Sequence, residues 1–146
     1  MKGSARIESR RVKRGWRMNQ SNLLYADISE EIIGAAFDVH NTLGPGLSEK
    51  TYQTALAIKL RDIGLAVEEE KVLSLFIGTE RVGEQRADLL VEDKIIVETK
   101  AIQKLLDDFS RKLLACLRNT KYQVGLLINF GTRVEFKRLI HSTEHK

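Results

Sequence analysis

The chain has 146 residues, of which 42% are hydrophobic, so it has the size of one ordinary domain and can bury a core. It contains no run of about eighteen apolar residues and no apolar segment behind the basic N-terminus, which argues against a membrane span and a secretory signal and favours a cytoplasmic protein. The single cysteine, Cys116, excludes an internal disulfide, and the three histidines are not spaced with it as a zinc site requires.

The formal charge of +4 is unevenly distributed along the chain. Residues 1–18 carry seven basic residues and one glutamate, whereas the remainder carries 17 basic and 19 acidic residues, a net charge of −2. We expect residues 1–20 to be a basic, disordered arm, because they show no apolar periodicity, and residues 27–140 to be a single domain. For the arm, phosphate binding, a solvated tail and an over-long start with Met18 as the true first residue are all alternatives.

Hydrophobic patterns predict eight elements after the arm. Apolar residues at helical spacing indicate three helices, and apolar runs bounded by glycine or polar turns indicate five strands. In order, we expect helices at 27–43 and 48–63, strands at 67–77, 81–91 and 95–100, a helix at 104–118, and strands at 124–130 and 134–140. The order α-α-β-β-β-α-β-β predicts an α/β fold with a central mixed sheet of four to five strands flanked by helices.

The hairpin predicted over residues 86–101 carries charge where a core strand pair would be apolar. If residues 92–94 form a three-residue loop, the two residue numbers of each cross-strand pair add up to 186. Asp88 then stands opposite Glu98 on one face of the hairpin. The predicted pairs on this face are Asp88 with Glu98 and Arg86 with Lys100. The other face would hold Ala87, Leu89, Val91, Ile95, Val97 and Thr99.

Two carboxylates and an ammonium group on one sheet face lose solvation, so they need a compensating partner. Asp88, Glu98 and the backbone carbonyl of Thr99 are hard oxygen ligands of the kind that bind Mg²⁺ or Mn²⁺. Lys100 would then orient or help to deprotonate an attacking water. The alternative is a solvent-facing hairpin with an ordinary Lys–Glu pair.

Asp88 followed by Glu98-Thr99-Lys100, in this order of elements, resembles the PD-(D/E)xK nuclease superfamily, with Ala87 where the name-giving proline often stands. The segment Gly46–Tyr52 also matches the pattern for which the G-x-x-E-x-x-Y (GxxExxY) family is named. The similarity extends through residues 86–94 and 125–131. It implies a restriction-endonuclease-like core.

The resemblance implies a metal-dependent nuclease, with Mg²⁺ or Mn²⁺, that hydrolyses phosphodiester bonds in nucleic acid, with DNA favoured over RNA. No membrane partner is implied, and a homodimer is an open alternative. The implied catalytic residues are Glu49, Asp88, Glu98 and Lys100, and those implied to contact substrate are Arg86, Lys104, Lys112 and Tyr52. Without the resemblance, Glu49 would be only a first-turn acid that suits the helix dipole.

One position departs from the family pattern. Where the family usually has a glutamine on the helix after the E-x-K strand, and a tyrosine four residues later, this chain has Lys112 and Cys116. Lys112 can still contact a phosphate. The departure leaves a second hypothesis, a catalytically weak or inactive module that binds nucleic acid or protein.

Overall fold

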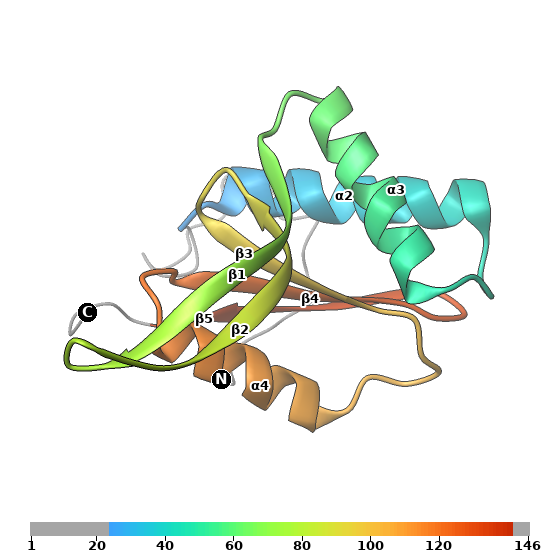
Figure 1. Ribbon diagram of the computed structural model, residues 1–146. Helices are drawn as coiled ribbons and strands as arrows, with labels where there is room; N and C mark the ends of the chain where they lie inside the picture. Colours follow the sequence, from blue (N-terminus) through green and yellow to red (C-terminus); the bar gives the residue numbers. More distant parts are fainter. Residues whose placement is uncertain (1–23, 142–146) are drawn as a thin grey trace.

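The computed structural model of the chain describes residues 24–141, so the expected arm at 1–20 lies outside the described residues (Figure 1). The elements are α2 (Ala26–Leu43), α3 (Glu49–Asp62), β1 (Val67–Ile77), β2 (Glu80–Val91), β3 (Ile95–Lys100), α4 (Asp107–Arg118), β4 (Val124–Phe130) and β5 (Val134–Ile140). Their order is the predicted one, which confirms the α/β class. Within the described residues, no helix is both long and apolar enough to cross a membrane.

The five strands form one mixed sheet in the order β1-β2-β3-β4-β5. Only β3 and β4 are parallel, and the other neighbours are antiparallel. Every residue of β4 is buried, as its uninterrupted apolar run predicts. Helices α2 and α3 cover one face of the sheet and α4 covers the other, so the sheet is enclosed in three layers (Figure 1).

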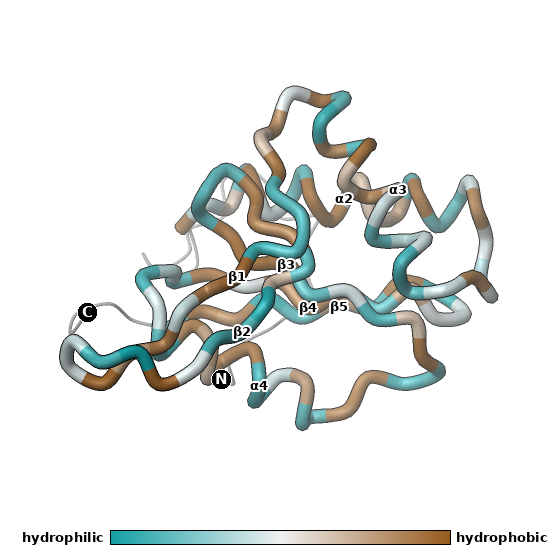
Figure 2. Tube along the Cα trace, in the orientation of Figure 1, coloured by the Kyte–Doolittle hydropathy of each residue, from teal (hydrophilic) through white to brown (hydrophobic). Residues whose placement is uncertain are grey.

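Two apolar clusters fill the space between these layers. One cluster joins α2 and α3 to side chains of β2, β3 and β4, among them Leu89, Val97 and Ile128. The other joins α4 to the opposite face, through residues such as Leu90 and Leu127. Figure 2 shows these central strands as a brown, apolar zone between more polar helix surfaces. Because β3 contributes to both clusters, charged residues at its C-terminal end lie at the edge of a continuous core.

The predicted hairpin register is confirmed. Leu89 pairs with Val97 and Val91 pairs with Ile95, so the partner numbers sum to 186 around a three-residue turn at 92–94. The pairing between β2 and β3 ends at Leu89, however, and Arg86 pairs with Val72 of β1 instead of Lys100. The expected ladder pairs at Asp88–Glu98 and Arg86–Lys100 are therefore absent, because β2 leaves β3 at Asp88.

The expected alternation of side chains also changes at Asp88. Leu89 packs with α2 and α3, but Ala87, predicted to share its face, packs with the α4 cluster. Glu70 faces this point from the neighbouring strand β1, where its φ of 53° interrupts the extended backbone. Ala87 and Leu89, on either side of Asp88, thus point to opposite faces of the sheet, whereas a strict two-residue repeat predicts the same face for both.

Helix α4 begins at Asp107, three residues later than the predicted start at Lys104. The Asn129 side chain holds the intervening loop, since it accepts from the Ile102 amide and donates to the Ile102 carbonyl, each at 2.9 Å. A Cβ added at Gly131 would lie 2.8 Å from the Ile102 carbonyl oxygen, so the close approach requires glycine there. The loop from β3 to α4 is therefore fixed to the end of β4.

The loop before α3 is held by Tyr52, which is fully buried. Its hydroxyl donates to the Gly44 carbonyl at 2.6 Å and accepts from the Leu47 amide at 3.1 Å. Its ring stacks on Phe130 of β4 with centroids 4.7 Å apart. Tyr52 thereby fixes the start of α3 relative to the sheet, and this buried structural position corrects the expectation that Tyr52 contacts substrate.

We predict that Tyr52→Phe lowers the free energy of unfolding by about 1–2 kcal/mol, because the Gly44 carbonyl and the Leu47 amide lose their shared partner. Urea denaturation measures this change. Tyr25→Phe is the matched control, since the Tyr25 hydroxyl makes no hydrogen bond within residues 24–141. Equal losses in the two variants would contradict the assigned role of the Tyr52 hydroxyl.

Candidate functional site

The site forms where β2 and β3 separate. Asp88 turns its carboxylate into the gap, and Oδ2 accepts hydrogen bonds from the Thr99 amide at 2.8 Å and the Thr99 hydroxyl at 3.0 Å. These two bonds replace the missing ladder contact and fix the carboxylate beside β3. Oδ1 accepts no hydrogen bond from the described part of the chain, so it is available to a ligand.

Glu98 precedes Thr99 and projects from the face of β3 that α4 covers. Burial and, to a smaller extent, the nearby Asp88 carboxylate raise the pKa of the Glu98 carboxyl to about 8. Lys100, a hydrogen bond from the Asp88 backbone and Lys112 act in the opposite direction but do not compensate fully. Two acids are thus held together in a partly desolvated position, which is the arrangement that a structural surface hairpin would avoid.

Helix α3 brings Glu49 toward the same two acids. Ser48 caps this helix by accepting from the Thr51 amide at 3.3 Å, so Glu49 occupies the first helical position. Burial raises the pKa of Glu49, Lys100 opposes the rise, and Asp88 adds to it. Glu49 therefore lies close enough to Asp88 and Lys100 for their charges to change its pKa, while its catalytic role stays a prediction.

A second polar group, not anticipated from the sequence, supports Asp88. The buried amide of Gln53 donates to Glu70 Oε2 at 2.8 Å and to the Asp88 carbonyl at 3.4 Å. The hydrogen bond from Gln53 lowers the pKa of Glu70, and a bond from Lys50 adds to that effect. Gln53 lies four residues after Glu49, on the same helical face, and this spacing could have predicted that Gln53 lies near the site. Glu70 gave no such signal within its run of three glutamates.

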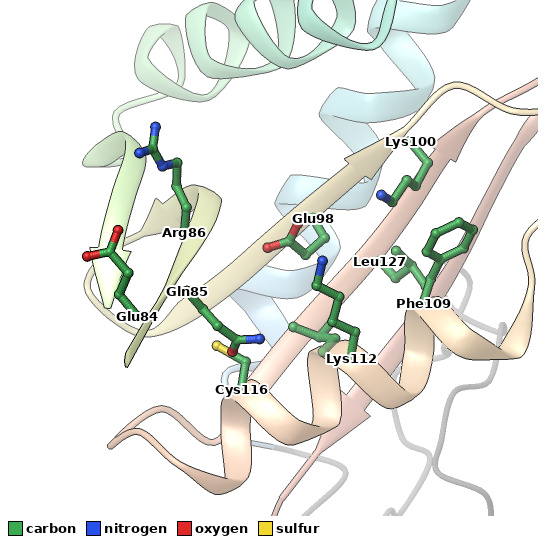
Figure 3. A pocket seen from close by; sticks show the side chains of 10 residues that line it. Glu84, Gln85, Arg86, Glu98, Lys100, Phe109, Lys112, Cys116 and Leu127 are labelled. Carbon is green, nitrogen blue, oxygen red and sulfur yellow. The ribbon is translucent and has the colours of Figure 1, made fainter. Parts of the chain in front are cut away.

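Lys100 and Lys112 reach the site from β3 and α4. The Lys100 ammonium lies 4.4 Å from the centroid of the Phe109 ring, a cation–π contact that helps to hold it. Figure 3 shows Glu98, Lys100 and Lys112 pointing into one recess. This recess is a pocket of about 390 Å³ between β2, β3, β4 and α4, and its lining includes Glu98 and Lys100.

The remaining residues expected to contact substrate are distributed differently. Arg86 lines the pocket, but its guanidinium also lies 3.6 Å from Glu70, so part of its charge is already compensated. Lys104 is exposed on the loop before α4 and does not line the pocket. Tyr52 is in the core. The structure therefore brings together Glu49, Asp88, Glu98, Lys100, Arg86 and Lys112.

The donor atoms fit a hard divalent cation. Within residues 24–141, no three side chains of Asp, Glu, His or Cys are arranged to hold a metal, so an ion here would have two carboxylate ligands at most. Mg²⁺ commonly binds through one or two carboxylates and keeps several waters. The free Oδ1 of Asp88 and the Glu98 carboxylate meet that requirement, and a cation between them would relieve the repulsion that contributes to the raised pKa of Glu98.

Comparison of the sequence with protein families identifies a superfamily. The profile described as the PD-(D/E)XK nuclease superfamily matches residues 26–139, which is most of the chain and nearly all of the described fold. The chain belongs to the PD-(D/E)XK nuclease superfamily. Asp88 and the segment 98–100, which the sequence analysis predicted to be the motif of this superfamily, meet where β2 and β3 separate. Membership in the narrower GxxExxY family stays a prediction.

Comparisons with solved structures and with curated proteins add no further assignment. The fold of this superfamily domain is similar to a solved structure titled "Crystal structure of SSO0001", with a TM-score of 0.44 and 15% sequence identity over 81% of this chain and 80% of that chain. Among curated proteins, no sequence matches the chain.

We predict that Glu98→Gln stabilises the metal-free superfamily domain at high pH, by on the order of 3 kcal/mol at pH 9. The pKa of Glu98 is raised to about 8 in the folded state from 4.5, so the wild type loses stability as pH rises from about 4.5 to 8. The neutral amide removes that loss, and the two proteins should be equally stable near pH 4. Chemical denaturation in a chelator at several pH values measures the difference.

The matched control is Glu31→Gln, because Glu31 is exposed on α2 and is not among the groups that shift the pKa of Glu98. It should leave the slope of stability against pH unchanged between pH 5 and 8. A wild-type stability that rises over this range, or a Glu98→Gln variant with the wild-type slope, would refute the electrostatic description.

Proposed function

We propose that this chain is a Mg²⁺- or Mn²⁺-dependent nuclease that hydrolyses phosphodiester bonds of nucleic acid, with DNA favoured over RNA. One observation carries the proposal: Glu98 lines the pocket beside Lys100, and burial together with the nearby Asp88 carboxylate raises the pKa of Glu98 to about 8. A site of this kind is unfavourable without a cation and suited to one. The match of residues 26–139 to the PD-(D/E)XK nuclease superfamily supports the same function.

The proposed metal ligands are Asp88, Glu98 and the backbone carbonyl of Thr99. When bound, Mg²⁺ would supply charge stabilisation at a phosphoryl oxygen and a lowered pKa of coordinated water. The hydrogen bonds from Thr99 to Asp88 Oδ2 orient the carboxylate so that Oδ1 faces outward. The protein's contribution is thus a rigid pair of oxygens at one edge of the sheet.

Lys100 is proposed to act on the attacking water. Its ammonium is held over Phe109, where it can orient the water oxygen toward phosphorus and offset negative charge that develops there. Glu49 is the proposed auxiliary acid, because burial raises its pKa and the charges of Lys100 and Asp88 act on it. The new oxygen–phosphorus bond forms as the bond to the leaving oxygen breaks, and the leaving oxygen takes up a proton.

Arg86, Lys104 and Lys112 are the proposed contacts to the nucleic-acid backbone. Lys112 is the strongest of these, since it lies in the pocket close enough to Glu98 to lower its pKa. Arg86 is shared with Glu70, and Lys104 lies on the loop that Asn129 anchors through Ile102. Backbone contact from these residues would position a substrate without reading its sequence.

A second candidate function is a catalytically weak or inactive nuclease-fold module that binds nucleic acid or protein. Two observations favour it: Lys112 and Cys116 stand where the family pattern has glutamine and tyrosine, and residues 24–141 carry 16 basic and 18 acidic residues. A nuclease that grips a duplex normally presents a broader basic surface. Metal binding and turnover distinguish the two functions.

We predict that Mn²⁺ raises the melting temperature of the wild type and supports cleavage of DNA in a mixture of DNA and RNA substrates. Asp88→Ala and Glu98→Ala should abolish the Mn²⁺-dependent shift and lower cleavage by at least about 100-fold, because each removes a proposed ligand. Cleavage is measured with end-labelled substrates. Equal activity in wild type and Glu98→Ala would indicate a contaminant or another site and would reject the proposed function.

We predict that Lys100→Gln lowers cleavage by about 100-fold or more but retains the Mn²⁺-dependent rise in melting temperature. The amide keeps the length of the side chain while removing the charge that would act on water. Lys121→Gln is the control, since Lys121 is an exposed surface residue paired with Asp93. If Lys100→Gln cleaves like Lys121→Gln, Lys100 has no role in the reaction.

A further inference from the structure

The pocket beside Glu98 has an apolar wall as well as charged groups. Glu98 and Lys100 line it from β3, and residues 84–86 line it from β2, while its apolar wall is built from α4 and from Leu127 of β4. The apolar side chains of this wall are Phe109, Leu113, Cys116 and Leu127. A volume of about 390 Å³ lies in the range of small-molecule sites. A metal ion and one phosphate need only the charged groups, so the apolar wall is unexplained by phosphodiester chemistry alone.

One polar atom in this recess lacks a partner. The side-chain oxygen of Gln85 is buried and accepts no hydrogen bond from residues 24–141. Gln85 reaches in from β2 toward Cys116, as Figure 3 shows, and lines the same pocket as Glu98 and Lys112. Buried amide oxygens are almost always satisfied, so the Gln85 oxygen gains a hydrogen bond when its side chain turns toward an N–H donor in the pocket.

These features define the ligand chemically. It has a flat or compact apolar body to cover the wall of α4 and β4, and an N–H donor for Gln85. It is also covalently joined to a group that belongs between Glu98, Lys100 and Lys112, where two ammonium groups favour a phosphate. A nucleobase attached to the reacting phosphodiester meets all three requirements.

We propose that this recess binds one unpaired nucleobase adjacent to the cleaved phosphodiester bond, with Gln85 accepting a hydrogen bond from the base. The proposal rests on the proposed nuclease function for the position of the phosphate. It also names a substrate class, because a base inside a duplex cannot enter a recess between a sheet and a helix without leaving its stack. The substrate is therefore a single strand, a flap or a frayed end.

The charge of the folded part agrees with this class. Residues 24–141 have a net charge of −2, which gives little electrostatic attraction to two phosphate backbones at once. Proteins that bind single strands obtain much of their affinity from contacts to the faces and edges of bases. A base pocket beside a small basic cluster, Lys100 and Lys112, is consistent with that mode of binding.

The test is a binding measurement that requires no cleavage. Fluorescence anisotropy in Ca²⁺ compares a labelled single-stranded DNA of about eight nucleotides with oligonucleotides carrying one abasic residue at each successive position, and with the same DNA as a duplex. We expect one abasic position to weaken binding by about fivefold or more, and the duplex to bind more weakly than the single strand. Equal affinity for every abasic oligonucleotide, tighter binding of the duplex, or no binding of single strands would overturn the proposal.

Gln85→Leu tests the pocket separately from folding. Leucine keeps the approximate size and removes the unsatisfied oxygen, so the melting temperature should be unchanged or higher while the affinity for the intact single strand falls. The penalty at the sensitive abasic position should shrink in this variant. Gln103→Leu is the matched control, because Gln103 is exposed and does not line the pocket. Wild-type affinity in Gln85→Leu would overturn the assignment of Gln85.

The two proposals fail in different ways. If Mn²⁺ supports no cleavage but binding still depends on one base and on Gln85, the nuclease function fails and the base pocket stands as a binding site. If cleavage occurs and depends on Glu98, while binding is insensitive to the base and to Gln85, the nuclease function stands and the base pocket is rejected.

Discussion

The arrangement of this domain depends on the two hydrogen bonds that Thr99 donates to the Asp88 carboxylate. At this point the antiparallel ladder between β2 and β3 ends, and the Thr99 amide donates to the Asp88 side chain instead of to a backbone carbonyl of β2. A buried Thr99 amide without this partner would carry an unmet donor. The Asp88 carboxylate therefore satisfies the backbone of β3 at the point where β2 and β3 separate. Because the strands separate there, Glu98 faces a pocket instead of another strand.

Groups from both faces of the sheet converge at this opening. Helix α3 contributes Glu49 and the buried amide of Gln53 from one side, while α4 contributes Lys112 from the other. The resulting field is mixed, since acids raise one another's proton affinity and the two lysines only partly offset them. Such incompletely neutralised negative charge destabilises a purely structural position, but it suits a site that binds a cation and a phosphate together.

Much of the fold could be predicted from the sequence, because hydrophobic periodicity gave every element and the sum of 186 gave the hairpin register. The same register predicted that Asp88 and Glu98 form a pair on one face, but the ladder ends at Leu89, so the two acids approach each other without that pairing. What escaped prediction depends on tertiary contacts: the left-handed Glu70 that turns the hairpin, the loop bonds of Asn129, and the burial of Tyr52. Whether a side chain lacks a hydrogen-bond partner depends on tertiary packing, so the unsatisfied oxygen of Gln85 could not be predicted from the sequence either.

The bonds between Asn129 and the Ile102 backbone have a further consequence for how such a site can diversify. They attach the chain leading into α4 to the end of β4, so the start of that helix is fixed independently of the residues further along it. Lys112 lines the pocket without belonging to the apolar cluster under α4, whereas Cys116 belongs to both. The charge beside Glu98 can therefore change by exchange of Lys112 with little effect on the packing of the helix.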